Sequence, residues 1–427
     1  MSSLRLKWLS IAPICLFNVA FGQLDRIIDK TKTLLAESKH QEVVSLLRFS
    51  VDADSTSSLL PYYLGLAYQG LSDHENAIVA LERAKQLDSA SIPAALALGR
   101  SYESIGLTQR GEEEYLHALS LDPTNRTGRL NLARMYAEVK RWDKAKSLYE
   151  GLIVEDTSNV FVQIQMARTC AALGMFDESI ISYERAFRRN PRNSLIALEL
   201  INVYLTTEQL ISARRIADRG LKVQPDHAAL IRRRGDIAFR EGMYVYAVTM
   251  YQRAIDHGDS SASVWKMLGT AQHFSGNSTG AEISLQQSFA IDTTDASTPF
   301  YLGVVKRNLK KLDESLALLH RAVGLLTAGL LPDAYIQLAV TSEERNNAKH
   351  AIRFYKKALE LNPAKADLIF HLATVYDKHY ADQTVASLYY KKFLSSSQGG
   401  SDLTEYATKR LGSLRERLHF QSANLKR

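Results

Sequence analysis

Three arginines recur at a constant spacing of 34 positions along the chain: Arg100, Arg134 and Arg168. A guanidinium group presents a planar fork of N–H donors that binds a carboxylate or a phosphate through two parallel hydrogen bonds. If one structural unit repeats at this spacing, these three groups must form a row. Such a row favours recognition of an acidic ligand, and Arg232 and Lys266 are placed to extend it.

The alternative to a binding row is a solvated helix face on which each arginine is neutralised locally. A helical residue contacts the residues three and four positions away. On that basis the candidate pairs are Arg100 with Glu103, Arg134 with Glu138, and Arg232 with Asp236. Arg168 is followed at those positions by Ala171 and Ala172, so the sequence predicts no local partner for it. Binding row and solvated face both remain open at this point.

Motifs for catalysis or metal binding are missing from the sequence. It has no glycine-rich phosphate loop, no nucleophile elbow and no paired-histidine metalloprotease motif. The 11 histidines are scattered, and His371 and His379 lack the spacing of metal ligands. Cys170 falls among packing residues and is expected to be an inert small hydrophobe. The sequence therefore predicts a binding protein with no enzymatic activity, no cofactor and no metal site.

The element that must position the arginines is a sequence repeat with the same period as their spacing. Its eighth position holds a small residue in all but one unit: Gly65, Gly99, Ala133, Ala167, Ile201, Gly235, Gly269 and Gly303. Its twenty-fourth position is bulky, as in Leu81, Tyr115, Tyr149, Tyr183, Tyr251 and Leu285, with Ala217 as the exception. Two helices that cross closely need a small residue at the contact, because a larger one forces their axes apart. The pattern therefore predicts helical hairpins.

These columns resemble the tetratricopeptide repeat family, and the resemblance covers nearly all of the chain from Gln23 onward. It implies an all-α fold, an α-solenoid of tandem helix-turn-helix repeats that form a right-handed superhelix. It also implies that the ninth position of each first helix, which Arg100, Arg134 and Arg168 occupy, lines a concave groove. Chaperone-binding members use a lysine and asparagine clamp that this chain never pairs, so capture of a chaperone tail is not expected.

The repeat sets the predicted domain boundaries. They are a signal peptide at 1–22, a degenerate repeat-like unit at 23–57, eight tandem units at 58–331, two further units at 332–398, and a C-terminal capping helix with a basic tail at 401–427. Arg234 and Lys306 depart from the apolar or aromatic residues usual at their positions. A two-residue slip at 323–331 predicts either a lengthened second helix or a partner contact.

The N-terminus indicates export. Arg5 and Lys7 precede an apolar stretch that is short for a membrane span and ends in small residues before Gln23, which is typical of a secretory signal peptide. An uncleaved anchor or a buried first helix is the alternative. Cleavage before Gln23 would leave Cys170 as the one thiol, so no internal disulfide is expected. We expect a periplasmic or envelope-associated protein, or otherwise a secreted one.

Together these features predict an exported scaffold or adaptor that binds partner proteins in its concave groove during assembly of an envelope complex. The expected partner offers an acidic segment, in keeping with the formal net charge of +7. The alternative is a receptor for an acidic polymer, a polysaccharide or a nucleic acid, of which nucleic acid is not expected. A third interpretation, an enzyme with an unrecognised site, is disfavoured by the missing motifs.

Overall fold

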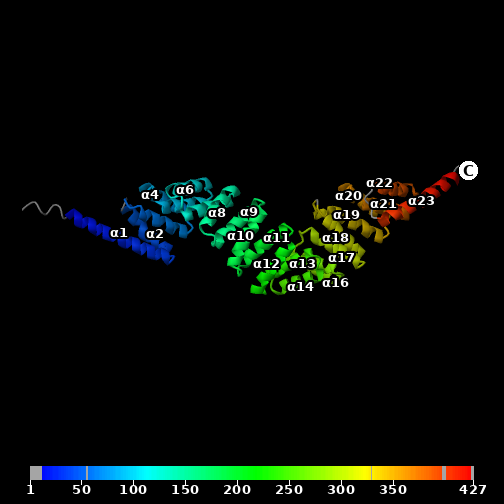
Figure 1. Ribbon diagram of the computed structural model, residues 1–427, viewed down its shortest axis with the longest axis horizontal. Helices are drawn as coiled ribbons and strands as arrows, with labels where there is room; N and C mark the ends of the chain where they lie inside the picture. The colour runs from blue at the N-terminus through cyan, green and yellow to red at the C-terminus, as the bar shows by residue number, and fades with distance from the viewer. Residues whose placement is uncertain (1–11, 54–55, 328, 397–400, 425–427) are drawn as a thin grey trace, which may run out of the picture. The chain divides into compact units, whose positions relative to one another are not determined.

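The computed structural model describes residues 12–53, 56–327, 329–396 and 401–424 (Figure 1). Every regular element in this part of the chain is an α-helix. The predicted all-α fold is therefore confirmed. The helices fall into two compact units, Met1–Val203 and Tyr204–Arg427.

In the first unit the helices follow one another as hairpins, in which an odd-numbered first helix precedes an even-numbered second helix. They are α1 (Ala12–Ala36), α2 (His40–Ala53), α3 (Leu59–Gly70), α4 (His74–Leu87), α5 (Ile92–Ser104), α6 (Thr108–Leu121), α7 (Arg126–Glu138), α8 (Trp142–Glu155), α9 (Val160–Ala172) and α10 (Phe176–Arg189). The next first helix, α11 (Ser194–Thr206), contains the boundary between the units.

The second unit continues the same alternation and ends in one additional helix. Its elements are α12 (Leu210–Val223), α13 (Ala228–Arg240), α14 (Tyr244–Asp256), α15 (Ala262–Phe274), α16 (Ser278–Ile291), α17 (Ser297–Asn308), α18 (Leu312–Leu325), α19 (Leu331–Glu344), α20 (Ala348–Leu361), α21 (Ala366–His379), α22 (Thr384–Ser395) and α23 (Ser401–Asn424). These spans give a helical solenoid, as predicted.

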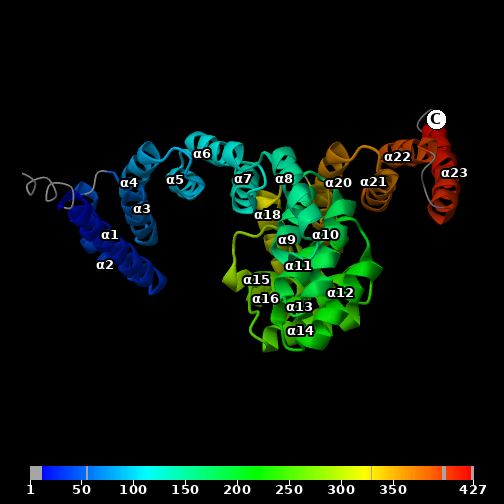
Figure 2. The ribbon, with the colours of Figure 1, turned by 60° about the vertical axis from the view of Figure 1, so that its left-hand side comes forward.

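Within each unit the helices pack mainly on the helix before and the helix after in sequence, as α4 does on α3 and α5, and α15 on α14 and α16 (Figures 1 and 2). First helices of successive hairpins also touch one another, as α3 does α5 and α5 does α7. Among the described residues, successive second helices have at most marginal contacts of this kind. The first helices are thus closer together than the second ones. We call the side that they line the inner surface of each unit.

Close packing within a hairpin explains the small residue at the eighth position. A Cβ atom on Gly99 would lie 2.6 Å from Cε1 of Tyr115, and one on Gly235 would lie 2.9 Å from Cε1 of Tyr251. Both tyrosines are fully buried. The ring of the second helix thus occupies the space that a side chain on the first helix would need.

A valine at position 99 is therefore expected to lower the free energy of unfolding by about 2 kcal/mol, because the buried Tyr115 ring cannot move away. Gly151→Val is the matched control, since the nearest atom to a Cβ there is Arg129 Nη1 at 3.8 Å. Thermal unfolding followed by circular dichroism compares the two variants. Equal melting temperatures for both would contradict this explanation of the glycine column.

The slip between 323 and 331 does not lengthen the second helix, contrary to the first of the two expectations. Helix α18 ends at Leu325 with 14 residues, the same length as α16. The connection from α18 to α19 spans residues 326–330 and is as long as the connection before α17, residues 292–296. The two extra residues instead lengthen the first helix α19, which has 14 residues where α17 has 12. The apolar side chains of the slip, Val323, Leu326 and Leu330, pack against buried side chains of this region. The chain itself therefore partly covers them.

Both ends of the chain carry helices that differ from the repeat. Helix α1 runs through the predicted cleavage site, and cleavage before Gln23 would leave residues 23–36, the 14-residue length of α2. Residues 1–11 of the predicted signal peptide lie outside the described part. None of the described helices is long and apolar enough to cross a membrane. At the other end, α23 buries Ala407, Leu411 and Leu414 against the last hairpin.

Candidate partner-binding surface

The first element of the site is an ion pair between neighbouring hairpins. Arg134 on α7 lies 3.2 Å from Glu103 Oε2 on α5. The Tyr115 hydroxyl donates a hydrogen bond of 2.8 Å to the same oxygen. The arginine side chain is 44% exposed and the glutamate only 9%. A buried tyrosine thus holds a carboxylate that in turn orients a half-exposed guanidinium group.

The same three residue types meet again two hairpins later. Arg168 donates to both carboxylate oxygens of Glu199, at 3.1 Å from Nε and 2.5 Å from Nη2. The hydroxyl of the buried Tyr183 donates to Glu199 Oε2 over 2.7 Å. Arg168 thus has a partner in the next hairpin, at a separation that the comparison of residues within one helix does not cover.

A constant separation of 31 residues connects these pairs: Glu103 precedes Arg134 by this number and Glu199 follows Arg168 by it. This separation is three positions shorter than the repeat period of 34. Each ion pair therefore connects two adjacent first helices at positions that differ by about one helical turn. For Arg100 the residues at this separation are Gln69 and Asn131, which carry no charge. Within the described residues the guanidinium group of Arg100, which is exposed, has no ion pair.

A hollow of about 420 Å³ lies beside Arg100 on the inner surface of the first unit. It is lined by Gln69, His74, Arg100, Glu103, Ser104, Arg134 and Glu138. Gln69 is already engaged, since its Nε2 donates to the Ala97 carbonyl at 2.6 Å. Burial raises the pKa of Glu103, and the neighbouring Glu138 carboxylate adds to this, against the effects of Tyr115 and Arg134. Arg100 is the arginine in this hollow that makes no ion pair within the described residues.

Between the two tyrosine–glutamate–arginine sets stands a third tyrosine without a carboxylate. Tyr149 is fully buried, and its hydroxyl has no hydrogen-bond partner among the described residues. Burial raises the pKa of this phenol to about 12. The residue that corresponds to Glu103 in this hairpin is Ala137. The hydroxyl of Tyr149 therefore lacks the carboxylate acceptor that Tyr115 and Tyr183 have.

Arg232 and Lys266, the predicted extension, belong to the second unit. Arg232 lies 3.5 Å from Asp259, and Lys266 lies 3.0 Å from both Asp295 and Ser297. Their side chains are only 31% and 24% exposed. In both cases the cation forms an ion pair with an aspartate in the loop before the next first helix. This ion pair neutralises the positive charge that an acidic ligand would need. The pairing with Asp236 that the sequence suggested is made by Arg233 instead, at 3.0 Å.

The aspartate partner of Lys266 gives a pH-dependent prediction. Although burial alone would raise its pKa, hydrogen bonds from Thr298, Lys266 and Ser297 lower the pKa of Asp295 to about 2. A lowered pKa adds stability above the ordinary value near 3.8 that is lost as the pH falls toward 2. We expect Asp295→Asn to lower the free energy of unfolding by about 1 kcal/mol at pH 7. The difference should vanish near pH 2, measured by urea unfolding at both pH values.

The sequence profile of the tetratricopeptide repeat matches residues 62–91, 92–125, 162–193 and 332–365. The chain is a tetratricopeptide repeat protein. The first of these matches contains Gln69, the second Arg100 and Glu103, and the third Arg168, whereas Arg134 and Glu199 lie outside the matched segments. No match falls on the predicted units from 228 to 331, where buried Arg234 and Lys306 replace the usual residues.

Solved structures with similar folds are distant in sequence. One is described as YrrB, a tetratricopeptide repeat protein with an unusual peptide-binding site (21% identity, covering 45% of this chain and 97% of that one, TM-score 0.40). Others are the Cut9–Hcn1 hetero-tetramer of the APC/C (15%, 90% and 89%, TM-score 0.46) and yeast Tom70 (12%, 93% and 96%, TM-score 0.39). No curated protein matches the chain.

Proposed function

We propose that this tetratricopeptide repeat protein is an exported scaffold for the assembly of an envelope complex, and that the inner surface of its first unit binds an acidic segment of a partner protein. Tetratricopeptide repeats support protein binding in general. The specific observation is that Arg100 presents an exposed guanidinium without an ion pair beside a hollow of about 420 Å³. A carboxylate entering there would form the pair that Arg134 and Arg168 form within the chain.

Two neighbouring features support a carboxylate as the ligand group. The chain itself fills the equivalent places with glutamates, Glu103 beside Arg134 and Glu199 beside Arg168, so the local geometry accepts this group. The Tyr149 hydroxyl adds a buried donor without an acceptor in the same row. A segment with acidic residues spaced along an extended backbone would therefore continue the ladder of ion pairs that already joins the hairpins.

Selection of short random peptides against the purified chain tests this proposal. We expect the selected peptides to be rich in aspartate and glutamate, and Arg100→Glu to weaken their binding by more than about tenfold, since it replaces attraction by repulsion. Arg110→Glu is the matched control, because Arg110 is also exposed but lies on α6, the second helix of the same hairpin. Its binding should stay within about twofold of the unchanged chain.

Salt dependence distinguishes the alternative ligand. A receptor for an acidic polysaccharide or nucleic acid would lose affinity steeply with ionic strength and would tolerate any sequence of the ligand. A protein segment recognised by shape and charge together would show a shallower salt dependence and a defined sequence. Selected peptides that lack acidic residues, or that bind the Arg100→Glu variant unchanged, would contradict the proposal.

Export is tested at the N-terminus. We expect the protein isolated from its native source to begin at residue 23, because the small residues before Gln23 suit a signal peptidase. Replacing Ala20 by a lysine should block processing and retain the longer form, as seen by intact mass. A native protein that begins at Met1 or Ser2 would contradict cleavage and favour the uncleaved alternative.

A further inference from the structure

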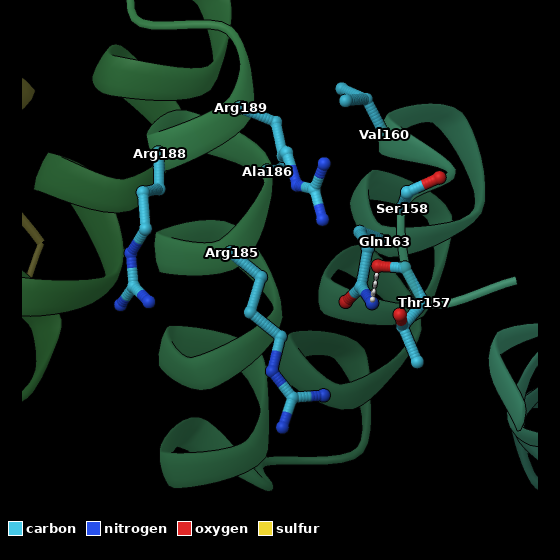
Figure 3. A pocket seen from close by; sticks show the side chains of 8 residues that line it. All are labelled: Thr157, Ser158, Val160, Gln163, Arg185, Ala186, Arg188 and Arg189. Atoms are coloured by element: carbon cyan, nitrogen blue, oxygen red, sulfur yellow. Dashed lines mark hydrogen bonds between the residues drawn. The ribbon is translucent and has the colours of Figure 1, made fainter.

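A second hollow of the first unit, about 380 Å³ in volume, lies away from the arginine row, between α10 and the turn that leads into α9. Thr157, Ser158, Val160 and Gln163 line it on one side, and Arg185, Ala186, Arg188 and Arg189 line it on the other. Figure 3 shows the side chains of Arg185 and Arg189 on the side of α10 that faces Gln163 and the turn. The lining carries three positive charges and no acidic residue.

Other hairpins use the position of Arg185 to close this junction. The residue there contacts a backbone carbonyl 28 residues earlier, in the turn before the first helix: His117 with Ser89 at 2.9 Å, Arg253 with Pro225 at 2.5 Å, and Arg321 with Thr293 at 3.3 Å. The corresponding carbonyl for Arg185 belongs to Thr157. It accepts instead from Gln163 Nε2, at 3.4 Å (Figure 3). Arg185 therefore does not bind this carbonyl, unlike the residues at its position in those three hairpins.

Two further arginines, Arg188 and Arg189, line the hollow beside Arg185, and the repeat pattern does not require an arginine at either position. Position 189 holds leucine, valine or isoleucine in several other hairpins, as at Leu87, Leu121, Val223 and Ile291. Within the described residues, Arg185, Arg188 and Arg189 take part in no ion pair. Glu184 precedes Arg185 in the sequence but does not line the hollow. Asp156, the acidic residue next to the turn, is already bound by Arg126 at 3.0 Å and by Ser158 at 2.6 Å. The hollow therefore offers three arginines and no acidic residue in its lining.

Gln163 supplies an independent sign of a missing ligand. Its side chain is only 2% exposed, and its Oε1 atom has no hydrogen-bond partner among the described residues. A buried amide oxygen without a donor is costly, because it has lost water and gained nothing in return. A ligand that suits the hollow must therefore accept hydrogen bonds from arginines and donate one to this oxygen.

We propose that this hollow binds a phosphoryl group, either free phosphate or a phosphate monoester. Two guanidinium groups can each donate two hydrogen bonds to the oxygens of such a group. The hydroxyls of Thr157 and Ser158 line the hollow as further polar groups. Inorganic phosphate keeps a P–OH at neutral pH that can donate to Gln163 Oε1, whereas a phosphate monoester keeps one only as its monoanion, below a pKa of about 6. A carboxylate has no O–H at neutral pH and leaves that oxygen unpaired. The volume also accommodates an ester substituent beside the phosphoryl group.

Calorimetric titration of the full chain at low ionic strength tests this site, with inorganic phosphate, phenyl phosphate and acetate as probes. We expect saturable binding of a phosphate probe with a Kd of about 1 mM or tighter. The tighter of inorganic and phenyl phosphate identifies the source of the group. Arg185→Ala and Arg189→Ala should each weaken binding by about tenfold or more. Arg110→Ala, which removes an equal charge from another hairpin, should leave it within about twofold.

A further variant guards against a trivial loss of folding. Gln163→Glu places a carboxylate beside Arg185, so it should abolish phosphate binding while the helical circular dichroism spectrum is retained. The proposal is overturned by any of three results: no saturable binding of either phosphate probe, unchanged binding by Arg185→Ala and Arg189→Ala, or acetate binding as tight as phosphate. None of these results bears on the inner surface, because Arg100 belongs to a different hairpin.

Discussion

Replacing Lys306 by alanine is expected to lower the free energy of unfolding by about 3 kcal/mol, the largest loss of stability that we predict for a single residue. Lys306 is only 5% exposed on α17. Its ammonium group donates to Glu282 on α16 at 2.5 Å and also to Glu314 on α18. Removing the cation leaves the mostly buried Glu282 carboxylate with the outer Lys311 alone. An uncompensated charge in such a place is costly.

The pH dependence of this effect follows from the two pKa values. Although burial alone would lower it, hydrogen bonds to Glu282 and Glu314 raise the pKa of Lys306. Hydrogen bonds from Lys306 and from Lys311, together with the positive charges of both groups, lower the pKa of the Glu282 carboxyl group although burial alone would raise it. The stabilisation is thus complete between the ordinary carboxylate and lysine values, is lost as the pH falls below the first, and is lost as it rises above the second.

Urea unfolding at several pH values between 4 and 11 measures this difference. Lys310→Ala is the control, because the Lys310 side chain is 77% exposed and its ion pair with Glu344 contributes less than about 1 kcal/mol. If Lys306→Ala and Lys310→Ala were equally stable at pH 7, the buried cation would not stabilise the α16–α18 region as we describe.

Glu199→Gln is expected to have two effects of opposite sign. The unfolding free energy should fall by about 2 kcal/mol, because the buried Tyr183 and the half-exposed Arg168 lose a charged hydrogen-bond partner that is itself partly buried. The binding of acidic peptides should become several-fold tighter, since the guanidinium group of Arg168 is released for a ligand. A loss of stability would thus accompany a gain in affinity at the same residue.

Differential scanning fluorimetry and fluorescence anisotropy with the peptides selected on the unchanged chain measure these two quantities. Glu150→Gln is the control, because Glu150 pairs with Lys146 within the exposed face of α8 and contacts no residue of the arginine row. A Glu199→Gln variant that binds acidic peptides more weakly would show that the glutamate, and not the arginine, serves the ligand.

Most of the fold could be predicted because packing within one hairpin involves residues 16 positions apart, such as Gly99 and Tyr115, and the repeat copies that relation along the chain. The helices therefore follow from the columns of small and bulky residues. The slip near residue 325 was harder, because apolar residues suit both a longer helix and a packed connection.

The charged partners of the site could not be predicted from neighbours within one helix. Arg134 and Arg168 find their glutamates 31 residues away on adjacent hairpins, a separation set by the stacking of first helices. A search for acidic residues 31 positions before or after each arginine would have found both pairs. The same search would have found no acidic residue for Arg100. The hollow beside Gln163 depends on which side chain takes the Thr157 carbonyl, which only the folded geometry decides.

Site-specific photocrosslinking in the native cell tests the central claim most directly. A photoreactive amino acid at position 104 lies in the hollow beside Arg100, whereas one at the exposed position 113 lies on α6, the second helix of the same hairpin. The account predicts a crosslinked protein adduct from position 104 that Arg100→Glu abolishes, and none from position 113. An adduct from position 113 alone, or one from position 104 that survives Arg100→Glu, would contradict binding through the inner surface.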